Sequence, residues 1–306
     1  MKKVILDTDM GVDCDDAVAL ALLLKKMKEG ECELLCVTAS STREGATATI
    51  KAICDYYETS SMPIGAMAYP AIPCDSMNNY GRAVKYAYGK EDVDTDAVAL
   101  MRKYLALVKE KITLIAIGPL TNIKRLLQSG ADTYSNQNGL ELVKEKVEAV
   151  YVMGGSFAEN YERKGWANRK ACAEWNIVQD IPSASFVVEN LPCPVYFLPY
   201  EAGWEVFTEM RSGENPVWFS MKQYAISEHL SYEPSFFRHS WDPITCLCAI
   251  SDVDAYFEFS KGGKITVTEE GKTVYTEKEN GMAHFALLKD NYKDVANLIN
   301  DMFKGD

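Results

Sequence analysis

The chain has 306 residues, of which 47% are hydrophobic, and its 32 Lys and Arg against 44 Asp and Glu give a net charge of −12. This hydrophobic content is typical of a globular protein and too high for a disordered one. A surface this acidic repels the phosphates of nucleic acids and anionic lipid headgroups, so neither is an expected partner.

The N-terminal segment and the cysteines both indicate a cytoplasmic protein. No stretch approaches the 18 consecutive apolar residues of a membrane span, and the first apolar run meets Asp7 too early for a signal peptide. The nine cysteines include no Cys-x-x-Cys pair, which gives little support to a zinc or redox site. We therefore expect reduced thiols that pack as small hydrophobic side chains.

Short apolar runs alternate with helical patterns along most of the chain. The runs predict strands at residues 4–6, 33–39, 113–117, 147–153 and 195–198. The intervening patterns predict helices at residues 17–28, 45–57, 121–128 and 204–211. Strands separated by helices are typical of βαβ units with parallel pairing.

We therefore predict an α/β fold with a mainly parallel, open, Rossmann-like sheet flanked by helices. Two short runs around a Gly turn predict a small C-terminal β-hairpin at residues 264–277, and a last helix is expected at 292–303. No linker or internal repeat interrupts the order, so residues 1–306 are expected to form a single domain.

An acidic loop follows the first predicted strand. Its five carboxylates fall within ten residues: Asp7, Asp9, Asp13, Asp15 and Asp16. Ligands collect at the carboxyl ends of parallel strands, and crowded carboxylates repel each other unless a cation neutralises them. This loop therefore predicts a Ca²⁺ or Mg²⁺ site. The alternative is a solvated acidic loop in which Asp15 caps the following helix.

At these residues the sequence resembles the inosine–uridine-preferring nucleoside hydrolase family. Residues 7–11 match its Asp-x-Asp-x-Gly loop, and Asp15-Asp16 match its Asp pair, two residues later than in the best-known members. Four further segments resemble the family's motifs in the same order: residues 118–122, residues 152–155, Asn168 with residues 173–176, and residues 242–243. Taken singly, each is also typical of an ordinary turn or helix start, and only their joint order carries the resemblance.

The resemblance implies the nucleoside hydrolase fold and Ca²⁺-dependent hydrolysis of the N-glycosidic bond of ribonucleosides. Asp9, Asp16, Asp242 and the backbone carbonyl of Thr121 would hold the ion. Asp9 would also take a proton from the metal-bound water that attacks the anomeric carbon. Positive charge develops on the sugar ring as the base leaves, and surrounding carboxylates stabilise such charge. The residues implied at the ribose are Asp15, Ser40, Met153, Asn168, Glu174, Trp175 and Asn176.

Two positions depart from the family's usual pattern. Ser40 stands where the family commonly has Asn, which removes one ribose contact or leaves it to water. Trp241 stands where many members have the His that protonates the leaving base. In this the chain resembles a purine-preferring branch of the family, which has Trp at that position. An indole stacked on a purine favours its protonated form by cation–π attraction. The alternative is that Trp241 is a plain core aromatic.

Other aromatic and imidazole side chains are weaker candidates for the base site. His239, three residues before Asp242, is interpreted as a local structural residue. The candidates for the opposite stacking face are Tyr80, Tyr86 and Tyr88.

These inferences predict a homodimeric or homotetrameric ribonucleoside hydrolase of nucleoside metabolism and purine salvage. One alternative is a catalytically silent nucleoside- or ribose-binding protein, consistent with Ser40 and Trp241. Another is a Mg²⁺-dependent phosphatase, but that chemistry needs a Lys or Arg beside the phosphoryl group. No basic residue adjoins residues 7–16 in the sequence.

Overall fold

The computed structural model describes residues 1–68, 80–160, 170–209, 213–233 and 236–304. Within these ranges no helix is both long and apolar enough to cross a membrane. The eight cysteines in the same ranges are all free, and all but Cys172 are buried, whereas Cys74 lies outside them.

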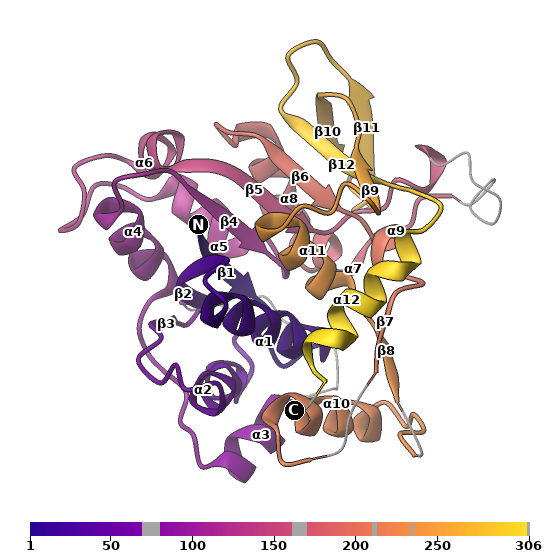
Figure 1. The fold of residues 1–306 in the computed structure, drawn as a ribbon. Coiled ribbons are helices and arrows are strands. Elements are labelled where there is room, and N and C mark those ends of the chain that lie inside the picture. The colour runs from indigo at the N-terminus through magenta and orange to yellow at the C-terminus, as the bar shows by residue number, and fades with distance from the viewer. Residues whose placement is uncertain (69–79, 161–169, 210–212, 234–235, 305–306) are drawn as a thin grey trace.

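In the described part of the chain, the main sheet has ten strands in the order β11-β10-β12-β6-β5-β4-β1-β2-β3, with β9 paired to β12 (Figure 1). From β12 to β3 in this order, each strand is parallel to the next. The N-terminal strands of this part are β1 (Lys2–Thr8), β2 (Cys32–Ala39), β3 (Ile64–Gly65), β4 (Ile112–Ala116), β5 (Val147–Met153) and β6 (Val195–Leu198). The C-terminal strands are β9 (Phe257–Phe259), β10 (Gly263–Val267), β11 (Thr273–Glu277) and β12 (Ala283–Leu288).

Two groups of helices flank this sheet, one packed around α1 and the other around α5 (Figure 1). The first group comprises α1 (Asp15–Lys28), α2 (Ala46–Tyr56), α10 (Pro216–Ser227), α11 (Trp241–Ile250) and α12 (Val295–Met302). The second comprises α4 (Ala97–Leu107), α5 (Thr121–Gln128), α6 (Gly139–Lys146) and α8 (Ile181–Asn190). The shorter helices are α3 (Tyr80–Tyr88), α7 (Trp175–Gln179) and α9 (Tyr200–Gly203), with 3-10 turns at Ala158–Asn160 and Tyr292–Asp294.

The first strand and helix show why the sequence folds this way. Val4, Ile5 and Leu6 are buried in β1, which lies between β2 and β4. A continuous apolar run is typical of a strand covered on both faces. The following helix α1 has Asp15 and Asp16 in its first turn and lysines in its last, which complements the helix dipole. The acidic loop therefore lies at the carboxyl end of a central strand.

The predicted α/β class and mainly parallel sheet are confirmed, but the helix expected at residues 204–211 is wrong. In the structure α9 (Tyr200–Gly203) precedes it, and Phe207–Glu209 forms β7, which pairs antiparallel with β8 (Phe237–His239). The hydroxyl groups of Thr208 and Ser240 lie 2.7 Å apart in a buried hydrogen bond. Pairing with a distant strand thus outweighs the local helical pattern.

The predicted C-terminal hairpin is also confirmed, and it continues the main sheet. β10 pairs with β12, which lies parallel to β6. The hydroxyl of Thr273, on β11, donates to the carbonyl of Ser156 and accepts from the N–H of Ser156, both at 3.0 Å. The hairpin is therefore joined to the segment that follows β5.

Candidate active site

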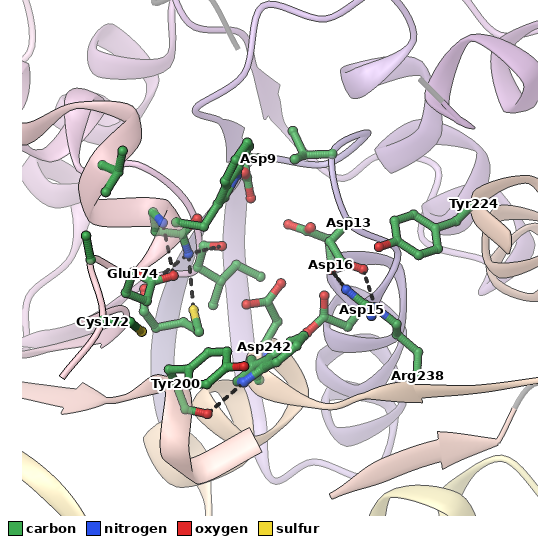
Figure 2. A pocket seen from close by; sticks show the side chains of 18 of the residues that line it. Asp9, Asp13, Asp15, Asp16, Cys172, Glu174, Tyr200, Tyr224, Arg238 and Asp242 are labelled. Atoms are coloured by element: carbon green, nitrogen blue, oxygen red, sulfur yellow. Dashed lines mark hydrogen bonds and ion pairs between the residues drawn. The ribbon is translucent and has the colours of Figure 1, made fainter. Parts of the chain in front are cut away.

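A cavity of about 530 Å³ lies where the ends of β1, β4 and β5 meet the first turns of α1, α7 and α11 (Figure 2). Asp9 follows β1, Ile117 follows β4 and Met153 ends β5. This is the edge of a parallel sheet at which ligands bind.

Three buried carboxylates that line this cavity, those of Asp15, Asp16 and Asp242, form a cluster. One oxygen from each lies within 4.8 Å of the others. The backbone N–H of Asp242 donates to Oδ2 of Asp15 at 3.1 Å, which joins α11 to α1. Oδ1 of Asp16 accepts a hydrogen bond from the hydroxyl of Thr8, whereas its buried Oδ2 has no partner among the described residues.

Burial and mutual repulsion make these carboxyl groups hard to ionise. Burial, followed by the charges of neighbouring acids, raises the pKa of Asp15, Asp16 and Asp242 well above the ordinary range. For Asp9, burial and the charges of nearby acids, chiefly Asp13, raise the pKa to about 8. An all-oxygen donor set with an unpartnered buried oxygen fits a hard divalent cation, which would replace these protons.

The two aspartates at the end of β1 have different surroundings. Asp9 lines the cavity. Asp7 lies outside the residues that line it: its Oδ1 accepts from the hydroxyl of Thr38 at 2.6 Å and from Nδ2 of Asn122 at 2.8 Å. Burial raises the pKa of Asp7 to about 7. We infer that Asp7 holds β1 to β2 and α5 through these hydrogen bonds.

Glu174 and Asn176 line the cavity, and Glu174 lies across it from Asp13 and Arg238 (Figure 2). Glu174 is the N-cap of α7, and its carboxylate accepts from the N–H groups of Gly155, Asn176 and Ile177 at 3.0, 3.0 and 3.3 Å. Burial nonetheless raises the pKa of Glu174 to about 7. Nδ2 of Asn176 donates to the carbonyl of Met153 at 3.2 Å. These contacts fix α7 to the end of β5.

The structure does not bring every predicted site residue to the cavity wall. Met153 and Trp175 line the cavity, but Thr121 and Ser40 do not. The hydroxyl of Thr121 donates to Asp180 at 2.7 Å, and the buried hydroxyl of Ser40 has no partner among the described residues. Asn168 lies outside the described residues.

Arg238 is a cavity residue that the sequence did not indicate. It comes from β8, and its Nε donates to Oδ1 of Asp13 at 2.8 Å while Nη2 bonds Oδ2. Its guanidinium carbon lies 4.9 Å from the ring centre of Tyr224 and 5.2 Å from that of Trp241. No basic residue adjoins the acidic loop in the sequence, but the fold brings Arg238 to Asp13 from 225 positions away.

Trp241 also lines the cavity, within a group of stacked rings. Its indole N–H donates to the carbonyl of Tyr200 at 2.8 Å, and the two rings stack 5.7 Å apart. The ring of His239 lies 4.7 Å from Trp241 and 4.5 Å from Trp204. Burial lowers the pKa of His239, which is not part of the cavity wall.

The tyrosines expected on the opposite stacking face lie elsewhere. Tyr80 is buried in α3, and its hydroxyl accepts from the N–H of Gly11 at 3.0 Å. The hydroxyl of Tyr86 contacts Glu44, and that of Tyr88 donates to the carbonyl of Glu214. None of the three lines the cavity, so this expectation is wrong. Residues 80–88 form a helix whose polar groups have other partners.

A mainly parallel α/β sheet with buried carboxylates at its carboxyl edge defines an α/β protein with a candidate cation site. The family model described as inosine-uridine preferring nucleoside hydrolase matches residues 4–300, and the chain belongs to this family. Its members are enzymes that cleave the N-glycosidic bond of nucleosides.

Individual relatives are distant. An uncharacterised protein of Schizosaccharomyces pombe is 26% identical over 263 residues, 78% of this chain and 74% of that protein. The non-specific ribonucleoside hydrolase RihC of Escherichia coli is 26% identical over 195 residues, a stretch that covers 61% of this chain and only 58% of RihC. A purine-preferring ribonucleoside hydrolase from Gardnerella vaginalis has the same fold, with a TM-score of 0.70, 19% identity and 98% of both chains covered.

Proposed function

We propose that this chain hydrolyses the N-glycosidic bond of ribonucleosides to a free base and ribose, favours purines, and uses Ca²⁺. The observation that carries the proposal is the buried cluster of Asp15, Asp16 and Asp242, which shares one cavity with Glu174 and Asn176. The family relationship supplies the reaction class.

Asp16 and Asp242 would hold the cation, with Asp9, Asp15 and the carbonyl of Thr121 as further oxygen donors. A bound divalent cation lowers the pKa of water and fixes the ribose through its vicinal hydroxyls. The buried and unpartnered Oδ2 of Asp16 supports this assignment.

Asp9 is the proposed general base. It lines the cavity beside the cluster, and as a carboxylate it can accept the proton of the attacking water. Positive charge on the ribose ring develops as the C1′–N bond breaks, and the carboxylates of Asp15 and Glu174 stabilise it. Asn176 would orient a ribose hydroxyl, because an amide offers both donors and acceptors without adding charge. Asn168 is proposed to do the same.

The base would occupy the end of the cavity that Trp241 lines. Aromatic surface there supports purine binding, since a bicyclic base buries more area than a pyrimidine. Among the relatives, RihC is a non-specific ribonucleoside hydrolase and the Gardnerella vaginalis protein is a purine-preferring one.

The test is release of free base and ribose from purine and pyrimidine ribonucleosides, with chelator and after readdition of Ca²⁺ or Mg²⁺. We expect turnover of purine ribonucleosides that is lost with chelator and restored by Ca²⁺. Binding of nucleosides without turnover would instead identify a silent binding protein. Turnover that persists in chelator would refute the role of the metal.

A further inference from the structure

We propose that Arg238 recognises the leaving base and stabilises the negative charge that it acquires, and that it selects purines with a 6-oxo group. The inference rests on the proposed function and names the group that acts where the family's usual His is missing. It is carried by the position of one guanidinium group in the cavity wall.

The guanidinium group is held in a fixed orientation. Asp13 engages Nε and Nη2 side by side, and the rings of Tyr224 and Trp241 lie 4.9 and 5.2 Å from its carbon atom. Only 18% of the Arg238 side chain is exposed. Such a bidentate and stacked arginine presents its remaining donors in one direction, as lysine could not.

Part of this group remains available to a ligand. Arginine has five N–H donors, of which Asp13 takes two. Arg238 lines the cavity, and its Nη1 has no hydrogen-bond partner among the described residues. A polar ligand in the cavity can therefore accept from it.

The position of Arg238 matches the end of the cavity where the base would lie. Figure 2 shows Glu174 on one side and Asp13, Arg238 and Tyr224 on the other, with Asp242 between them. A ribose held by Glu174 and the cation cluster would direct its base toward Arg238.

The reaction needs such a group at that end. The oxygen of water forms a bond to C1′ as the C1′–N9 bond breaks, and the electron pair of that bond passes to the base. Asp9 takes the proton of the water, and solvent protonates the departed base. The negative charge spreads to N7 and O6 of a 6-oxopurine, two acceptors that a guanidinium group engages together. Arginine keeps its own proton, so it acts by charge and hydrogen bonding.

The same donors discriminate against two other species. The amino group of adenine places a donor against a donor, so one acceptor contact is lost and a polar group is left unpaired. A purine protonated at N7 before it leaves would likewise place a donor against the donors of Arg238. The geometry therefore favours departure of the base as an anion over its prior protonation on Trp241.

The test compares wild-type protein with Arg238→Gln and Arg238→Lys on inosine, guanosine, adenosine and 4-nitrophenyl β-ribofuranoside. Nitrophenolate is a stable leaving group without a hydrogen-bond donor from the protein. Cleavage of the nitrophenyl riboside therefore depends only on the chemistry at the ribose and the cation. The matched control is Arg82→Gln, which removes an arginine that is 62% exposed and paired with Glu44 on the surface.

We expect Arg238→Gln to lower kcat/KM for inosine and guanosine by about 10²-fold, as loss of a transition-state donor does. The loss for nitrophenyl riboside should be at least tenfold smaller, and the wild-type preference for inosine over adenosine should shrink. Arg238→Lys should restore part of the rate without the preference. Arg82→Gln should change none of these ratios.

Equal losses on all four substrates would overturn the proposal and make Arg238 a structural residue. A second measurement on wild-type protein avoids any folding defect: hypoxanthine must bind more tightly than adenine in calorimetry, and the reverse order overturns the selection. Failure of the proposed function looks different, because the wild-type protein would then release nothing from any substrate, nitrophenyl riboside included.

Discussion

The N–H of Asp242 donates a 3.1 Å hydrogen bond to the carboxylate of Asp15, although the two residues are 227 positions apart. This bond joins the first turn of α11 to the first turn of α1. Two helix N-termini therefore meet at one acidic cluster, and their positive dipole ends partly offset its charge.

Asp16→Asn should weaken Ca²⁺ binding at least about tenfold, since changes even behind a metal ligand cost about 10–100-fold in affinity. The carboxylate is fully buried and has one oxygen without a protein partner. Titration calorimetry with Ca²⁺ measures the effect. The matched control is Asp94→Asn, which removes an exposed carboxylate outside the cavity. Equal affinities for both variants would place the cation elsewhere.

The metal-free protein should lose stability as the pH rises from about 4 to about 8. Folding raises the pKa of Asp9 from 3.8 to about 8 and that of Glu174 from 4.5 to about 7. Over this window the unfolded chain releases protons that the folded chain keeps, so the free energy of unfolding falls with pH. Well below pH 4 these two groups are protonated in both the folded and the unfolded state, so the loss is absent.

Calcium should reverse this loss, because the cation replaces the protons. We expect scanning calorimetry to show a larger increase in Tm on adding Ca²⁺ at pH 8 than at pH 5.5, by several degrees. A Ca²⁺ effect that is larger at the lower pH would contradict the assignment of these carboxylates to a cation site.

Asp9→Asn should lower kcat for ribonucleosides by about 10²–10⁴-fold, the usual contribution of a general base. Substrate binding should change much less, because the amide keeps the shape of the side chain. Steady-state kinetics with inosine, together with nucleoside binding to the inactive variant, separate the two effects. A proportional rise in KM with unchanged kcat would show that Asp9 only binds substrate.

Gly118→Ala should reduce both stability and turnover, because there is no room for a methyl group at this position. A Cβ atom would lie 2.6 Å from Oγ of Ser40 and 2.8 Å from both Cβ and the backbone N of Asp9. Overpacking of this kind costs about 1–3 kcal/mol. Urea denaturation and inosine kinetics measure both effects.

Gly130→Ala is the matched control, since no atom beyond the adjacent residues of the chain lies within 4 Å of the added carbon. It should leave turnover unchanged. If Gly118→Ala behaves in the same way, Asp9 does not depend on close packing against the turn before α5.

Much of the fold was predictable because its signals are local. The apolar run of β1 and the acidic turns that follow it place Asp9, Asp15 and Asp16 at the carboxyl edge of a parallel sheet. Adjacent residues in a strand–loop–helix unit cannot separate, so their proximity follows from their spacing. Glu174 and Asn176 likewise share one helix start, where capping holds them together.

The base end of the site was not predictable in the same way. The strand β7 forms only because β8 pairs with it, and the three tyrosines expected to stack on the base lie outside the cavity. Local propensity carries no information about which distant surfaces meet.

The sequence alone thus determined the sheet class, the acidic loop and the family's motifs, because each depends on neighbours along the chain. Only the tertiary structure decided that Asp13 pairs with Arg238 and that Arg238 lies against Trp241. That pairing depends on bringing residues 225 positions apart into contact. Packing of the whole sheet and its helices offsets the entropy lost when these two residues are brought together. No local sequence pattern encodes that packing.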